Sequence, residues 1–89
     1  MGTKKKLHLK DVSKTQLEKM QHALGLNRHS KPYRNYYFLH DLDQDWEDLV
    51  TKGFAVRITE GSSNVYYVTF EATKLVYGKK ITRDDYKEL

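Results

Sequence analysis

The chain has 89 residues, of which 38% are hydrophobic, and a formal net charge of +4, and it contains no cysteine. This length predicts one small domain. The lack of cysteine excludes disulfides, thiolate catalysis and zinc or iron–sulfur sites that use thiolates, and it fits a reducing cytoplasm. No apolar run approaches the ~20 residues that a membrane-spanning helix needs, so we expect no contact with a membrane.

The charge is unevenly distributed along the chain. Residues 1–40 carry nine Lys and Arg residues against two acidic ones, whereas residues 41–89 carry seven against ten. A basic half suggests an anionic partner for one face of the domain. An ordinary solubilising charge pattern explains the same numbers equally well.

Residues 1–10 form a basic lead-in that contains Lys4, Lys5 and Lys6. The segment lacks the apolar stretch of ~7–15 residues that a secretory signal needs. Leu7 and Leu9 alternate with polar residues, so a short edge strand and a disordered tail both remain open.

A first helix is predicted from Lys14 to Leu24. Ser13 and Gln16 have the spacing of a capping box, and Gly25 followed by Leu26 is typical of a left-handed helix end. The apolar stripe of this helix consists of Leu17, Met20 and Leu24.

An extended segment is predicted next. After a loop at 27–32, which ends at the only proline, the aromatic content of residues 33–40 favours a strand. Its alternation is imperfect, so a turn or a short helix can occupy part of it.

A second helix is predicted to begin at Asp43 or Asp45, either of which can cap it, and to end at Gly53. Its buried face would consist of Trp46, Leu49 and Val50.

A β-hairpin is predicted to follow. Phe54, Val56 and Ile58 alternate with polar or small residues and indicate a half-buried strand. Residues 61–64 have the composition of a tight turn, and residues 65–70 return antiparallel.

Two short helices complete the prediction. Thr69 can cap a helix that buries Ala72, Leu75 and Val76 and ends at Gly78. Thr82 with Asp85 can cap a last helical turn. The elements together predict one small α+β domain, with a tail at 1–10, a body at 11–80 and a short C-terminal segment at 81–89.

The segment from the second helix through the hairpin resembles the last third of bacterial winged-helix regulators. The matching positions are Leu49, Gly53, Val56, Tyr67 and Thr69, and Thr73 replaces the final glycine of that pattern. The resemblance implies a winged-helix-like body. A complete winged helix has three helices before its wing, and only one is clear before Asp41. Either the segment at 33–39 supplies a further short element, or the fold is a reduced relative.

A second resemblance covers residues 22–75. The runs HALGL at 22–26, PYRN at 32–35, LVTKGFA at 49–55 and YVT at 67–69 are similar to those of small phage and prophage proteins. This resemblance implies a phage protein that works in the bacterial host cytoplasm, and it implies no activity.

No catalytic or metal-binding motif is complete. Asp41, Asp43 and Asp45 have the spacing that opens an EF-hand loop, but that loop needs Gly at its sixth and Glu at its twelfth position, where this chain has Trp46 and Lys52. There is no nucleophile-elbow pattern around a serine. We therefore expect a protein that is not an enzyme and has no cofactor and no metal.

Cationic and amide side chains interleaved with tyrosines form the strongest candidate site. Cations bind phosphates, and aromatic rings can stack on unpaired bases. The predicted nucleic-acid-binding residues are Lys4, Lys5, Lys6, Arg28, Lys31, Arg34, Asn35 and Arg57. The alternative is that the tyrosines pack in the core and the Lys and Arg side chains only keep a surface loop hydrated.

The second helix argues against a standard winged-helix docking mode. Asp45, Glu47 and Asp48 give it a negative face, which is costly beside phosphate. We therefore expect nucleic acid to meet the basic N-terminal half. The alternative function is a protein–protein adaptor without nucleic-acid affinity, which would use this acidic helix together with an exposed Tyr66 or Tyr77.

Overall fold

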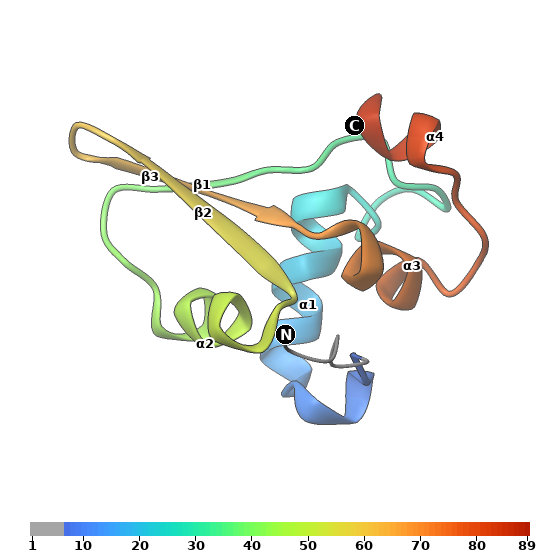
Figure 1. The fold of residues 1–89 in the computed structure, drawn as a ribbon, viewed down its shortest axis with the longest axis horizontal. Helices are drawn as coiled ribbons and strands as arrows, with labels where there is room; N and C mark the ends of the chain where they lie inside the picture. The colour runs from blue at the N-terminus through green and yellow to red at the C-terminus, as the bar shows by residue number, and fades with distance from the viewer. Residues whose placement is uncertain (1–6) are drawn as a thin grey trace, which may run out of the picture.

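Eight short elements make up the domain in the computed structural model, which describes residues 7–89. They are the 3-10 turn η1 (Leu9–Asp11), α1 (Lys14–Leu24), β1 (Tyr37–Leu39), α2 (Gln44–Lys52), β2 (Ala55–Glu60), β3 (Ser63–Val68), α3 (Phe70–Tyr77) and α4 (Arg83–Lys87). The sheet packs against α1 and α2, and α3 packs against α1 (Figure 1). This arrangement confirms a small α+β domain with a β2–β3 hairpin.

The predicted helix ends are confirmed. The hydroxyl of Ser13 accepts a hydrogen bond from the backbone N–H of Gln16, whose side chain accepts one from the Ser13 N–H in return. At the other end of α1, Gly25 has a φ of 81°, and the Leu26 N–H donates to the Gln21 carbonyl at 2.8 Å. Asp43 is the residue that caps α2, since its carboxylate accepts from the Trp46 N–H at 3.0 Å.

The sheet is antiparallel with the strand order β1-β3-β2. The predicted extended segment is wrong in part, because the strand is limited to Tyr37–Leu39. The residues before it wrap back onto the end of α1 instead. The N–H of Tyr33 donates to the Leu24 carbonyl at 3.1 Å, and the N–H of Tyr36 donates to the Ala23 carbonyl at 3.2 Å.

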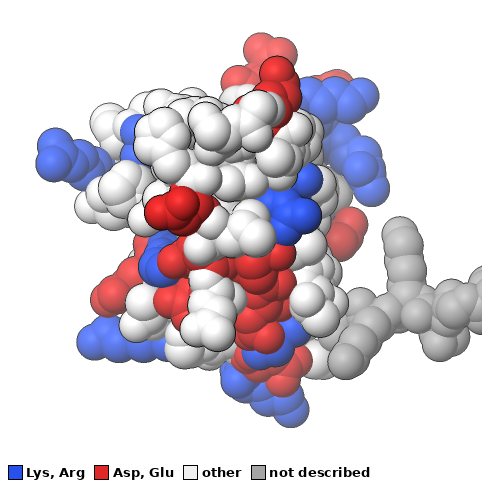
Figure 2. All heavy atoms as spheres, turned by 90° about the vertical axis from the view of Figure 1, so that its left-hand side faces the viewer, with Lys and Arg blue, Asp and Glu red and all other residues white. Residues whose placement is uncertain are grey.

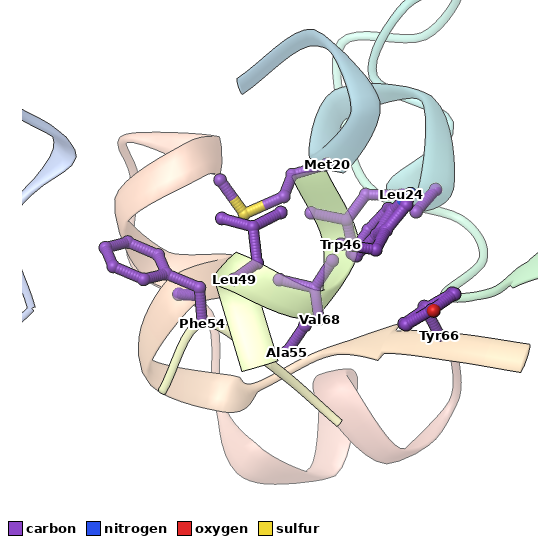
Figure 3. Packing of buried hydrophobic residues seen from close by; sticks show 10 residues of the cluster. Met20, Leu24, Trp46, Leu49, Phe54, Ala55, Tyr66 and Val68 are labelled. Atoms are coloured by element: carbon purple, nitrogen blue, oxygen red, sulfur yellow. The ribbon is translucent and has the colours of Figure 1, made fainter. Parts of the chain in front are cut away.

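The core lies between the inner face of the sheet and the helices (Figure 3). Trp46 is completely buried and stacks on Tyr66, with ring centroids 5.3 Å apart and an interplanar angle of 19°. The other buried apolar residues are Met20, Ala23, Leu24, Leu49, Phe54, Ala55, Val68 and Ala72. Residues from α1, α2, β2, β3 and α3 therefore share one core.

The prediction that Val56 and Ile58 line the core is wrong. Their exposed fractions are 48% and 47%, although Phe54, just before the strand, is buried as predicted. Only Ala55 is buried within β2. Ala55 and Arg57 pair with Val68 and Tyr66, which are buried on the inner face of β3, so Val56 and Ile58 lie on the opposite face of the sheet. The tip of the hairpin also extends beyond the helices (Figure 1). The alternation in β2 correctly assigned Val56 and Ile58 to one face of the strand, but it did not determine which face packs against the helices.

The C-terminal segment packs onto the rest of the domain. Thr82 caps α4, as predicted, by accepting from the Asp85 N–H at 3.1 Å. The hydroxyl of Tyr86 donates to the Val68 carbonyl at 2.6 Å, and Leu89 packs against the core. Among residues 7–89, no helix is both long enough and apolar enough to cross a bilayer.

Candidate nucleic-acid interface

Arg34 is held between two tyrosine rings. Its guanidinium carbon lies 5.4 Å from the ring centroid of Tyr33 and 5.6 Å from that of Tyr36. The Arg34 Nη2 donates to the His22 carbonyl at the end of α1, at 2.9 Å. The two rings are 50% and 51% exposed. The loop therefore presents a fixed cation flanked by two aromatic surfaces that solvent reaches.

The end of α1 positions this arrangement. The ring of Tyr33 packs directly on Gly25, where a Cβ atom would lie only 2.1 Å from the nearest ring carbon. His29 contacts the same ring edge-on, with centroids 4.4 Å apart. Only glycine fits at this position, because the space that a side chain would need is filled by the tyrosine and because φ is positive.

The cations near this loop lack carboxylate partners. Within residues 7–89, no carboxylate oxygen lies within 4.0 Å of the side-chain nitrogens of Arg28, Lys31 or Arg34. We call the set of Arg28, Lys31, Tyr33, Arg34 and Tyr36 the basic–aromatic cluster. Its positive charge is available to an anionic ligand.

A groove of about 440 Å³ continues the cluster towards the C-terminal segment. Lys31 and Tyr33 line one part of it, and Tyr77 and Lys80 line another. The sequence analysis named Tyr77 only for an adaptor surface and did not name Lys80, because both residues lie more than 40 positions beyond the loop. No local signal in the sequence reports that proximity. Asp85 and Glu88 also line this groove, so its charge is mixed.

A second groove, of about 310 Å³, joins Arg34 to the edge of the sheet. Its lining includes His22, Tyr36 and Phe38. Aromatic side chains therefore continue from the loop along β1.

Asn35 is one of the predicted nucleic-acid contacts, but its side chain makes hydrogen bonds to the backbone of β3. Its Nδ2 donates to the Val68 carbonyl at 2.9 Å, and its Oδ1 accepts from the Val68 N–H at 2.8 Å. The amide thus pairs with Val68 as a neighbouring strand residue does. Lys4, Lys5 and Lys6 lie outside the described residues.

Arg57 is separated from the cluster. It projects from β2 towards α2, and its Nη1 lies 2.5 Å from a carboxylate oxygen of Glu47. The loop that carries the basic–aromatic cluster lies at the α4 side of the molecule, away from the tip of the hairpin (Figure 1). Lys31 and Arg34 thus both lie close to Tyr33, Arg28 belongs to the same loop, and Arg57 lies elsewhere.

The surface around α2 is acidic. Seen from the hairpin end, Asp and Glu side chains gather in the lower half of the molecule, and Lys and Arg lie mostly at its margins (Figure 2). Several cations on this side are paired with carboxylates: Lys19 lies 2.8 Å from Asp43, and Lys52 lies 2.9 Å from Asp48. This face offers little positive charge to a phosphate.

The Glu47 carboxylate connects α2 to the hairpin. Hydrogen bonds from Arg57 and from the Tyr66 hydroxyl, the latter at 2.6 Å, hold the pKa of Glu47 below its usual range. Because the pKa is lower in the folded than in the unfolded state, the ionised form favours folding. This contribution is complete above the unfolded pKa of about 4.3 and is lost as the pH falls through the folded pKa.

Glu47→Gln is therefore expected to lower stability at neutral pH and to make unfolding less dependent on pH between about 5 and 3. Urea unfolding of both proteins at several pH values measures this. The loss should be modest, because the pair is about one-third exposed and water screens it. Parallel pH profiles for the two proteins would show that Glu47 contributes nothing through its charge.

Comparison of the chain with protein-family models, with curated proteins and with solved structures gave no match. In residues 7–89, no three His, Asp or Glu side chains are grouped so that they could hold a metal ion. Function is therefore inferred from the geometry of this chain's own residues.

Proposed function

We propose that this domain is a non-enzymatic accessory module that binds single-stranded nucleic acid through its basic–aromatic cluster. One observation carries the proposal: the Arg34 guanidinium is fixed between two half-exposed tyrosine rings, and no carboxylate of residues 7–89 neutralises it. A cation close to two exposed rings matches a ligand that alternates phosphates with flat bases.

The tyrosines favour single strands over duplex. A base can stack on a tyrosine ring only when it is not stacked on the neighbouring bases of its strand. Each such base–ring stack contributes about 1–3 kcal/mol. The three cations of the cluster supply up to three phosphate contacts, which predicts a log–log salt slope of about −2 for a single strand.

The fold is consistent with a reduced winged helix. Helix α2 leads directly into the β2–β3 hairpin, which takes the place of the wing, but only α1 and α2 precede that hairpin as α-helices within residues 7–89. Since Asp45, Glu47 and Asp48 lie on α2, its insertion into a DNA groove would bring carboxylates close to phosphates. The basic–aromatic cluster supplies the binding surface instead. We further propose, from the resemblance to phage proteins, that it acts in a bacterial host cytoplasm.

Charge reversal at Arg28 and Lys31, two exposed positions, tests the proposal. Arg28→Glu with Lys31→Glu is expected to weaken binding of a labelled single-stranded oligonucleotide more than about tenfold, because two phosphate contacts become repulsive. Fluorescence anisotropy at several salt concentrations measures this. The matched control is Lys10→Glu with Lys14→Glu, which makes the same change of charge at the other end of α1.

Stacking is tested separately by Tyr36→Ala, which leaves the charge unchanged. Its expected effect is a loss of affinity of about five- to 150-fold on single strands and a much smaller loss on duplex. Circular dichroism establishes that each variant is folded. An equal loss of binding in the control at Lys10 and Lys14 would mean that only net charge matters, and would refute a defined site.

A protein–protein adaptor is the second candidate function. It is favoured by the exposure of Phe38, Val56 and Ile58 on one face of the sheet, which supplies an apolar surface. An apolar interface of this kind is nearly insensitive to salt, whereas nucleic-acid binding weakens steeply as salt rises. Absence of oligonucleotide binding even at low salt would make the adaptor the better explanation.

A further inference from the structure

The outer face of the sheet is apolar, and no helix within residues 7–89 packs on it. The register places Phe38, Val65 and Ile58 side by side across the three strands, and it places Tyr67 beside Val56. Residues paired in this way point to the same face. The opposite, inner face of β3 carries Asn64, Tyr66 and Val68, which are buried. We call Phe38, Val56, Ile58, Val65 and Tyr67 the outer sheet face.

These side chains are unusually exposed for their type. Phe38, Val56 and Ile58 are 51%, 48% and 47% exposed. The face is also hollowed, since Phe38, Ile58, Val65 and Tyr67 line a depression of about 390 Å³. A contiguous apolar patch with a depression is typical of a surface that receives apolar side chains from a partner.

The charge of this face restricts what can cover it. None of its five side chains carries a charge, and among residues 7–89 Glu60, at the hairpin end, is the one charged residue that lines the depression. Nucleic acid finds no cation here, and a charged protein surface would lose its hydration without gaining an ion pair. The occupant must therefore be an equally neutral, apolar surface.

We propose that the outer sheet face binds the same face of a second copy of this chain, in a two-fold symmetric dimer. A two-fold interface uses the same patch on both subunits, so a neutral apolar patch is complementary to itself. Two sheets can pack face to face about 10 Å apart with interdigitating side chains, as in β-sandwiches. A symmetry axis that runs across the strands places the two Glu60 carboxylates at opposite ends.

The available area determines the strength of this dimer. The exposed parts of the five side chains amount to roughly 300–400 Å² per copy, taking about 150–250 Å² for a whole aromatic side chain. The pair then buries well below the ~1,200 Å² at which standard stable interfaces begin. The dimer is therefore weak and reversible, and it forms as concentration rises. The basic–aromatic cluster contains none of these five residues, although Phe38 also lines the groove beside Arg34, so the two proposals are tested by different variants.

Sedimentation velocity of the full chain over a range of concentrations tests the proposal. High salt is used so that surface charges do not contribute. The expected result is a shift of the average mass from the monomer value of 10.5 kDa towards twice that value. Ile58→Lys places an unpaired charge in the interface and is expected to raise the dimer dissociation constant at least about tenfold.

Leu42→Lys is the matched control, because Leu42 is 60% exposed but lies outside the outer sheet face, in the loop between β1 and α2. The Leu42→Lys variant should have the same dimer dissociation constant as the unmodified chain. The proposal is overturned by a chain that stays monomeric at every concentration, which would leave a foreign protein as the occupant. It is equally overturned if Ile58→Lys dimerises normally, or if both variants lose the dimer alike.

Discussion

Trp46→Ala is expected to lower the free energy of unfolding by about 3–5 kcal/mol, the usual cost of emptying a large aromatic site. A domain of this size has a total stability of about 4–13 kcal/mol. The expected loss is therefore a large share of the total stability, and the urea midpoint of the variant should fall steeply. Equilibrium unfolding in urea, followed by far-UV circular dichroism, measures this loss.

The large cost follows from the contacts of the indole. Trp46 is completely buried, and besides stacking on Tyr66 it packs against Tyr37 with ring centroids 5.2 Å apart. It thus joins α2 to two of the three strands. Tyr36→Ala is the control, because half of that ring is exposed and its loss should cost much less. A cost below 1 kcal/mol for Trp46→Ala would contradict this description of the core.

Gly25→Ala is the second large effect, with an expected loss of about 2–5 kcal/mol. Its φ of 81° costs an alanine about 1–2 kcal/mol. The new Cβ also meets the Tyr33 ring at 2.1 Å, so the ring must move, and such overpacking typically costs about 1–3 kcal/mol. Displacement of Tyr33 should in addition weaken oligonucleotide binding.

Gly61→Ala separates these two causes. Gly61 also has a positive φ, of 58°, but no atom lies within 4 Å of the position of its Cβ. It should therefore cost only the backbone strain, about 1–2 kcal/mol, and should leave oligonucleotide binding unchanged. If urea unfolding gave equal losses for the two variants, the close packing of Tyr33 on Gly25 would be refuted.

Local signals predicted the helices well. The bounds of α1, its capping box and its glycine end were all predicted correctly, because each of these features depends on residues at most five positions apart. The caps at Thr69 and Thr82 were confirmed for the same reason. A residue and its hydrogen-bonded neighbour in such motifs are both visible in one short window of sequence.

Features that depend on distant residues were not predictable in this way. Whether Val56 and Ile58 face the core depends on which face of the sheet the helices pack against, which the alternation of β2 does not encode. Asn35 was predicted as a ligand contact because its polar amide lies among cations and tyrosines in the sequence, but its partner Val68 lies 33 positions away. Lys80 joins the candidate site only through folding, and its neighbours in sequence give no indication of this.

The double hydrogen bond between Asn35 and Val68 also has a consequence for affinity. The Asn35 amide further donates to the Tyr86 hydroxyl at 3.3 Å, so the loop, the end of β3 and α4 are fastened at one point. Such an anchor fixes the backbone on either side of Asn35, and with it the two tyrosine rings, before any ligand arrives. The conformational entropy of this loop is therefore lost when the domain folds and is not lost again when a ligand binds. A small surface can then bind more tightly than its area alone suggests.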